Sequence, residues 1–158
     1  MSNVSYSVKS KNKIGIFNKT IEVDSDKSIS IRAFLISSIS QGVSKINKVL
    51  ESEDVFSSIK CLKKLGIKIK KMSKGNYLVY GKGLGSLIAK KNTTLDFGNS
   101  GTLARLLIGI LSTTPNIKLK ITGDKSLKKR NMLKLIELMN KFGANFKNKR
   151  PFLPMNII

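Results

Sequence analysis

The order of helix-like and strand-like segments constrains the fold of this chain more than any other feature of its sequence. A helix, a strand, a second helix, a glycine and a strand follow one another twice. In the first copy the helices are expected at 28–40 and 52–65, the strands at 43–49 and 67–69, and the glycine is at 66. In the second copy the helices are expected at 101–111 and 132–142, the strands at 117–122 and 144–146, and the glycine is at 143. Arg32 and Arg105 occupy matching places in the two copies, as do Gly66 and Gly143. This order predicts two mixed α/β units packed side by side, although two amphipathic segments can also match by chance.

Local patterns fill in the remaining elements of this prediction. Residues 67–69 and 77–80 are expected to form a hairpin, the glycine-containing stretch 81–92 a loop, and residues 6–8 and 20–23 short strands. For the first helix, apolar spacing predicts a buried stripe of Ile29, Ala33, Ile36 and Ser40, with Ser28 as the N-cap and Gly42 as the stop. The chain ends in an apolar, strand-like segment at 151–158 and is interpreted as cut within a unit.

The positive charge of the chain raises the question of nucleic acid as a partner. The formal net charge is +21, but 26 of the 30 basic residues are Lys and only four are Arg. Sequence-reading proteins use Arg forks, and single-strand binders use exposed aromatics, whereas aromatics here make up only 6%. We therefore expect no specific nucleic-acid partner, and at most weak, nonspecific affinity for phosphate.

Several classes of site are excluded by composition. The chain has no His, and Cys61 is its single cysteine, which removes imidazole bases, an internal disulfide and a thiolate zinc site. We expect no metal and no cofactor. No apolar run approaches the roughly 18 residues of a membrane span, and residues 1–10 lack the apolar core of a signal peptide. A cytoplasmic location with no membrane partner is the resulting expectation.

Basic and small polar residues mark three strand-to-helix corners. Lys27 and Ser28 stand at a helix start, where free amides favour an anion, and Arg32 returns to the same face one turn later. Asn99 and Gly101 open a second helix, where a residue without Cβ allows a ligand close to the backbone. Arg130 ends the loop 122–130. Because such corners face one side of an α/β layer, we expect one anion-binding face.

These segments resemble, in order, those of 5-enolpyruvylshikimate-3-phosphate (EPSP) synthases. The resemblance rests on the following residues: Lys27-Ser28 with Arg32, Ser52 to Asp54, Leu65-Gly66, Asp96 to Thr102, Thr122 to Arg130, and Gly143-Ala144. It implies a two-domain fold of repeated βαβαββ units. Residues 1–158 would then be an N-terminal part, with a crossing strand and about two units near 24–98 and 99–158, and without the second domain.

The resemblance also implies roles for individual residues. Lys27 would contact both shikimate-3-phosphate and phosphoenolpyruvate, and Ser28 and Arg32 would bind shikimate-3-phosphate. Asn99, Gly101 and Arg130 would bind phosphoenolpyruvate. Two positions depart from the family pattern: Ile31 stands where a polar residue is usual, and Asn131 where a proline is usual.

The implied reaction transfers the enolpyruvyl group from phosphoenolpyruvate to the 5-hydroxyl of shikimate-3-phosphate, in the shikimate pathway to chorismate. The family's acid–base groups would lie beyond residue 158, so no catalytic residue is expected within this chain, and the chain alone is expected to be inactive. The missing part of the enzyme is then its implied partner, and the complete enzyme is expected to be a monomer.

Two alternatives stay open at this point. One is the related UDP-N-acetylglucosamine enolpyruvyl transferase, which uses a lysine–asparagine pair where this chain has Lys27-Ser28, and a reactive loop cysteine. Cys61 stands in an amphipathic segment beside Leu62 and is expected to be structural. The other alternative is a noncatalytic basic fragment that binds anions or nucleic acid.

Overall fold

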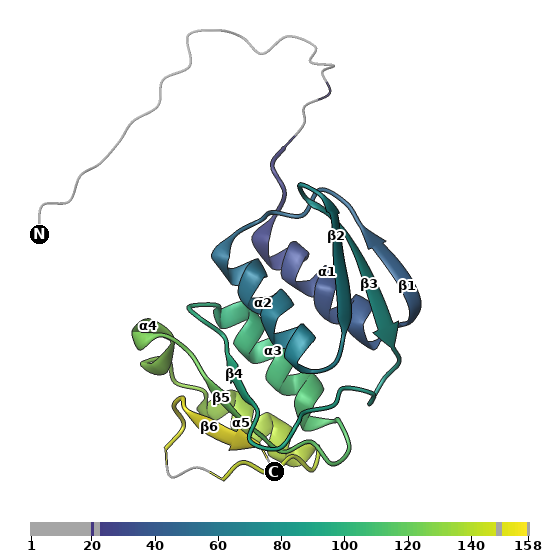
Figure 1. The fold of residues 1–158 in the computed structure, drawn as a ribbon. Helices are drawn as coiled ribbons and strands as arrows, with labels where there is room; N and C mark the ends of the chain where they lie inside the picture. Colours follow the sequence, from purple (N-terminus) through teal and green to yellow (C-terminus); the bar gives the residue numbers. More distant parts are fainter. Residues whose placement is uncertain (1–19, 21–22, 148–149, 158) are drawn as a thin grey trace, which may run out of the picture.

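The computed structural model describes residues 20, 23–147 and 150–157, and it is a mixed α/β structure, as expected (Figure 1). Its helices are α1 (Lys27–Ile39), α2 (Glu53–Lys64), α3 (Gly101–Ser112), α4 (Lys125–Lys128) and α5 (Leu133–Lys141). Its strands are β1 (Gln41–Ile46), β2 (Lys68–Ser73), β3 (Asn76–Lys82), β4 (Thr94–Asp96), β5 (Leu119–Thr122) and β6 (Met155–Ile157). None of the helices in this described part is long and apolar enough to cross a membrane.

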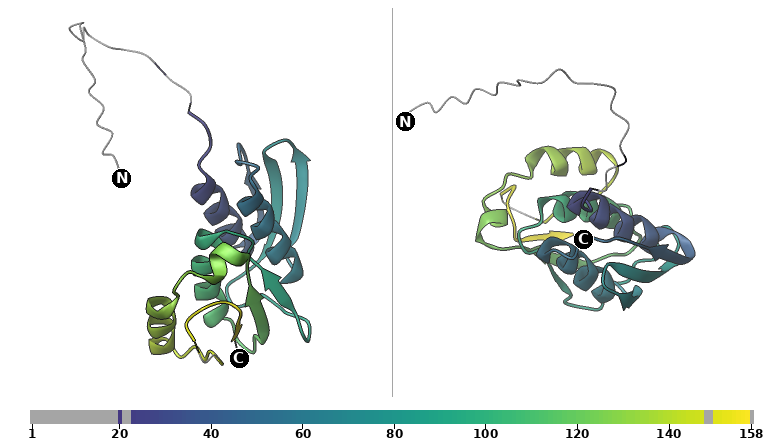
Figure 2. Two further views of the ribbon diagram at one scale, coloured as in Figure 1. Left: turned by 90° about the vertical axis from the view of Figure 1, so that its left-hand side faces the viewer. Right: turned by 90° about the horizontal axis from the view of Figure 1, so that it is seen from above.

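The strands form two separate three-stranded sheets. In the first, β3 lies between β1 and β2 and is antiparallel to both, and the predicted hairpin is present with Ser73 paired to Asn76. In the second, β5 lies between β4, which is parallel to it, and β6, which is antiparallel. Helix α1 packs against α2, α3 and β3 of the first sheet, and α2 also contacts β4 of the second (Figures 1 and 2).

The buried face of α1 is not the one that apolar spacing predicted. Ile29 and Ile36 are 65% and 61% exposed, whereas Ile31, Phe34 and Leu35 are buried. Phe34 meets the ring of Tyr77 on β3 edge-on, with ring centroids 5.2 Å apart. Because α1 is apolar on two faces, its periodicity could not show which face would meet the sheet.

Three further expectations about local structure were wrong. The N-cap of α1 is Asp26, whose carboxylate accepts a hydrogen bond from the Ile29 amide at 2.6 Å, and not Ser28. The helix ends before Ser40, so Gly42, with φ +88°, lies in β1 rather than stopping the helix. Residues 144–146 form only a single bridge, from Phe146 to Ile157.

Glycines end α2 and follow α5 as predicted, since Gly66 and Gly143 have φ values of +84° and +86°. The order helix, strand, helix therefore occurs in both parts of the chain, although the short α4 was not foreseen. The division into units at 24–98 and 99–158 stays a prediction. The strand expected at 6–8 lies outside the described residues, as does part of the one expected at 20–23.

The tip of the β2–β3 hairpin is fastened to the loop that leads into α2. Glu51 accepts hydrogen bonds from the Gly75 amide at 2.8 Å and the Tyr77 hydroxyl at 2.7 Å, and it pairs with Lys71 at 2.9 Å. The Val49 amide also donates to the Gly75 carbonyl at 2.9 Å. We call the contacts of Glu51 with these three residues the Glu51 clasp; they fix the loop three residues before Asp54.

Candidate functional site

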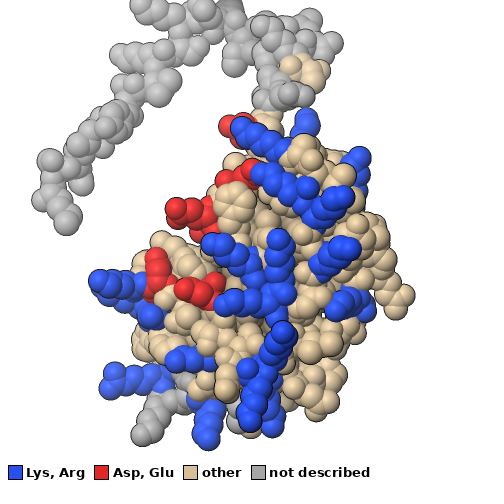
Figure 3. Space-filling view, in the orientation of Figure 1, with Lys and Arg blue, Asp and Glu red and all other residues tan. Residues whose placement is uncertain are grey.

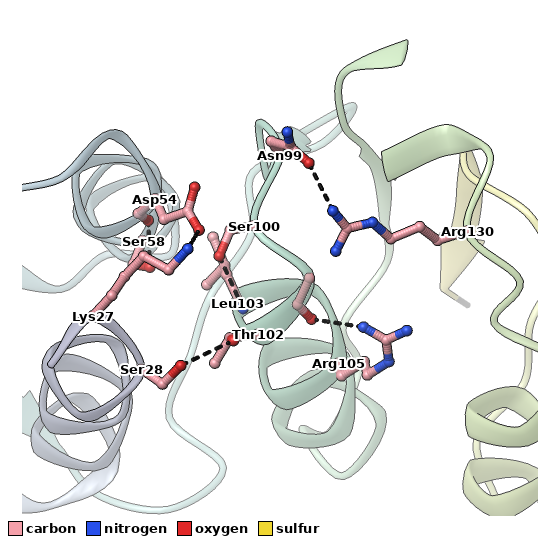
Figure 4. A network of polar contacts seen from close by, with 11 residues as sticks. Lys27, Ser28, Asp54, Ser58, Asn99, Ser100, Thr102, Leu103, Arg105 and Arg130 are labelled. Carbon is pink, nitrogen blue, oxygen red and sulfur yellow. Dashed lines mark hydrogen bonds and ion pairs between the residues drawn. The ribbon is translucent and has the colours of Figure 1, made fainter. Parts of the chain in front are cut away.

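The three corners predicted from the sequence meet at one cleft of about 290 Å³. It is lined by Lys27, Asp54, Asn99, Gly101, Thr102, Arg105 and Arg130. The first residues of α1 and α3 lie side by side here, and the loop after β5 brings Arg130 over the start of α3 (Figure 4). The expectation that the corners share one side of the molecule is therefore confirmed.

The α1 side of the cleft already contains its own counter-charges. Lys27 forms an ion pair with Asp54 of α2 at 2.9 Å, in which the carboxylate side chain is only 18% exposed. Asp26 caps the helix with a second carboxylate. The Ser28 hydroxyl lies 3.4 Å from the Thr102 hydroxyl, which links the first turn of α1 to that of α3.

The α3 side of the cleft has a neutral cap and two guanidinium groups. Ser100 is fully buried, and its hydroxyl accepts a hydrogen bond from the Leu103 amide at 3.2 Å. Arg130 donates to the side-chain oxygen of Asn99 at 3.0 Å, and Arg105 donates to the Gly101 carbonyl at 3.3 Å. Helix amides and two cations thus face the same space without a carboxylate on this side.

Gly101 lies directly beneath both guanidinium groups. A Cβ built at this position would approach Arg130 Nη1 to 2.5 Å and Arg105 Nη1 to 3.0 Å. Only a residue without a side chain therefore leaves both arginines where they are. The helix start and the two cations are packed as one surface for a ligand.

Backbone contacts hold the loop of Arg130 in place. The Phe97 amide donates to the Thr122 carbonyl at 3.0 Å, and the Asp124 amide donates to the Gly98 carbonyl at 2.9 Å. Asp124 in turn caps α4 by accepting from the Leu127 amide at 2.6 Å. The turns that follow β4 and β5 are consequently joined, which places Arg130 opposite Asn99.

Sequence reasoning identified most of this cleft but assigned no substrate to three of its members. Lys27, Asn99, Gly101 and Arg130 line it, and Ser28 touches it through Thr102. Arg32 is exposed one turn further along α1 and is not among the lining residues. Thr102 and Arg105 were recognised as polar and basic residues of the second corner but were given no substrate. Asp54 was recognised only within the motif Ser52 to Asp54, because its pairing with Lys27 depends on the packing of α2 against α1.

The lining of the cleft has a net positive charge, which suits an anionic ligand. Three cationic side chains and one carboxylate line it, a formal net charge of +2, and the carboxylate is held by Lys27. Cys61 lies outside the cleft, is 1% exposed and donates to the Asp96 carbonyl at 3.3 Å. Burial raises the pKa of its thiol to about 12, so it has the properties of a structural residue and not of a reactive loop cysteine.

Comparison with known proteins places the chain in one family of transferases. The profile of the family described as EPSP synthase (3-phosphoshikimate 1-carboxyvinyltransferase) matches residues 11–157. The chain belongs to the EPSP synthase family.

Individual relatives agree with this assignment. The 3-phosphoshikimate 1-carboxyvinyltransferase of Desulforamulus reducens is 40% identical over 139 residues, which are 87% of this chain and 32% of the relative. That of Syntrophomonas wolfei is 43% identical over 130 residues, or 82% of this chain and 30% of the relative. The solved structure of EPSP synthase from Acinetobacter baumannii superposes with a TM-score of 0.79 at 31% identity, covering 87% of this chain and 31% of that one. The chain thus spans about a third of the length of these relatives.

Proposed function

We propose that this chain supplies one face of the substrate site for enolpyruvyl transfer from phosphoenolpyruvate to the 5-hydroxyl of shikimate-3-phosphate, which yields EPSP and phosphate. The proposal is supported by the family assignment together with the +2 cleft at the starts of α1 and α3. Both substrates are anions with phosphate and carboxylate groups, and such groups suit helix amides and guanidinium forks.

The two sides of the cleft would each bind a different substrate. On the α3 side, phosphoenolpyruvate would be held by Gly101 and by Arg130, whose hydrogen-bond partner is Asn99. The cleft lining on this side has no carboxylate to pair with its cations. Ser28 and Arg32 would contact the shikimate-3-phosphate ring on the α1 side. Lys27 would reach both substrates, since it lines the shared cleft from the α1 side and its side chain is 47% exposed.

Proton transfer and closure over the substrates would come from the part of the enzyme that this chain does not contain. The cleft offers one carboxylate, Asp54, and that group is engaged by Lys27. We therefore expect residues 1–158 alone to bind without turnover. The complete enzyme would be a cytoplasmic monomer.

A chimera tests this proposal directly. Residues 1–158 replace the matching segment of the Desulforamulus reducens relative, which is 40% identical to them; we refer to this protein as the chimera. We expect it to release phosphate only when phosphoenolpyruvate and shikimate-3-phosphate are both present, while the 158-residue chain releases none.

The chimera is compared with the unmodified relative by circular dichroism and thermal melting, so that misfolding is recognised. A folded chimera that binds neither substrate would contradict the proposal. Turnover by the 158-residue chain alone would contradict the expected absence of acid–base groups.

A further inference from the structure

A second cleft, of about 540 Å³, lies at the second sheet, which is formed by β4, β5 and β6. Its lining includes Lys91, Thr94, Lys118, Lys120, Lys147 and Asn156. Lys91, Thr94, Lys118 and Lys120 lie before or near the start of β4 or β5, and Asn156 lies in β6, whereas the substrate cleft follows the ends of β4 and β5. Because β4 and β5 are parallel, the two clefts lie at opposite ends of this strand pair.

The register of the sheet explains why lysines gather here. Lys118 and Lys120 alternate with the buried Leu119, so they project from the same outer face of the central strand. Lys120 is paired with Thr94 on one side and with Asn156 on the other. The Lys147 amide donates to the Asn156 carbonyl at 3.1 Å, which brings a further lysine to this edge.

No carboxylate neutralises these lysines. The lining contains four Lys and no Asp or Glu, and within the described parts of the chain their ammonium groups have neither an ion pair nor a hydrogen bond. Lys71 and Lys27, by contrast, each have a carboxylate partner. In Figure 3 several Lys and Arg side chains stand among uncharged residues on the lower part of the visible face, where no Asp or Glu is seen among the described residues.

The donor set indicates what kind of anion would fit. Lysine ammonium groups are compact point charges with three N–H donors each, and hydroxyl and amide groups of Thr94 and Asn156 lie among them. The lining has neither an Arg fork for a single carboxylate nor an aromatic ring for a nucleobase. The volume lies in the range of small-ligand sites. A ligand whose negative charge is spread over several groups would match the four separated cations better than a single compact anion would.

We propose that this cleft is a second anion site, which takes a small ligand with several linked phosphate groups. This inference goes beyond the proposed enolpyruvyl transfer and does not depend on it. The site is separate from the substrate cleft, because the two clefts share no residue.

Inorganic triphosphate is the probe, titrated into the 158-residue chain by calorimetry and by amide NMR shifts. The test variant is Lys118→Gln/Lys120→Gln, and the control is Lys68→Gln/Lys70→Gln. The control has the same Lys-x-Lys spacing around a buried residue, Ile69, and removes the same charge from the first sheet. We expect the amide shifts of residues that line this cleft to report one saturable event, with about tenfold weaker binding in the test variant and a change of less than about twofold in the control.

Two further arms separate this site from other binding. Arg105→Gln/Arg130→Gln removes two cations of the other cleft, so it should leave this event within about twofold while any triphosphate bound at the substrate cleft is weakened. Orthophosphate should bind at least about tenfold more weakly than triphosphate. Equal losses in the two lysine variants, loss of this event in the arginine variant, or equal affinity for orthophosphate would overturn the proposal. Binding of a twelve-nucleotide single-stranded RNA that is tighter than that of triphosphate would also overturn it, in favour of a nucleic-acid surface.

Discussion

The starts of α1 and α3 face the same cleft, yet they are electrostatic opposites. At α1 the free amides meet the carboxylate of Asp26, and Lys27 is paired with Asp54. At α3 the cap is the neutral hydroxyl of Ser100, and Arg105 and Arg130 lie over Gly101. Both helices have the same partial positive charge at their N-terminus. The two starts therefore differ in how far the protein compensates that positive charge.

Arg130→Lys should have the largest effect on the α3 side. An ammonium keeps the charge but cannot donate two parallel hydrogen bonds while Asn99 accepts one from the same group. We expect about 1.5 kcal/mol of lost binding energy, or roughly tenfold weaker phosphoenolpyruvate binding to the chimera with shikimate-3-phosphate present. Lys128→Arg, on the same loop, is the control. Affinity within about twofold of the parent would assign Arg130 a purely electrostatic role.

Gly101→Ala should disturb the same side by displacing its cations. The new methyl group meets Arg130 Nη1 at 2.5 Å, and the flexible guanidinium will move aside at modest cost. We expect phosphoenolpyruvate binding to weaken by about fivefold, and shikimate-3-phosphate binding by less than about twofold. Calorimetry with each substrate measures the difference.

Gly109→Ala is the matched control for this substitution, because it lies on the same helix and its Cβ would meet only Met139 Sδ, at 3.9 Å. It should leave binding unchanged and stabilise the helix by about 0.5–1 kcal/mol. Equal losses for both substrates in Gly101→Ala would mean that the position serves the fold and not the ligand.

Asp54→Asn tests whether the α1 side can be made to resemble the α3 side. Removing this carboxylate frees Lys27, so orthophosphate should bind the 158-residue chain about threefold more tightly. Glu53→Gln, the adjacent acid on α2, is the control and should change phosphate affinity much less. Equal gains from the two substitutions would show that overall charge, and not the Lys27 pair, sets the difference between the sides.

The Glu51 clasp provides the smallest expected effect, seen in the dependence of stability on pH. The Lys71 ammonium, the Gly75 amide and the Tyr77 hydroxyl hold the pKa of Glu51 at about 2, below its usual 4.5. Its contribution to stability is therefore full above pH 4.5 and is lost as the pH falls towards 2. The Tm of Glu51→Gln should fall less than that of the parent chain between pH 5 and 3. Glu53→Gln should retain the parental fall; an identical pH dependence in Glu51→Gln would contradict the prediction.

The sequence predicted those features that depend on local pattern. The hairpin across 73–76, the glycines after α2 and α5, and the gathering of Lys27, Gly101 and Arg130 all follow from turn chemistry and strand-to-helix corners. What it could not predict depends on tertiary packing. Ile29 and Ile31 are equally apolar, and the packing of α1 against α2 and β3 decides which is buried. The pairing of Asp54 with Lys27 likewise depends on the packing of α2 against α1.

Gly123 helps to keep Arg130 in position, although it does not line the cleft. A Cβ at this position would lie 2.9 Å from the Gly98 carbonyl and 2.5 Å from Leu127 Cδ2. The carbonyl is backbone and already accepts from Asp124, so it cannot rotate away as a side chain could. A substitution here would spread the turns after β4 and β5 and swing Arg130 away from Asn99. Substitutions at Gly123 would then lower the affinity for substrate, although this residue is not among those that line the cleft.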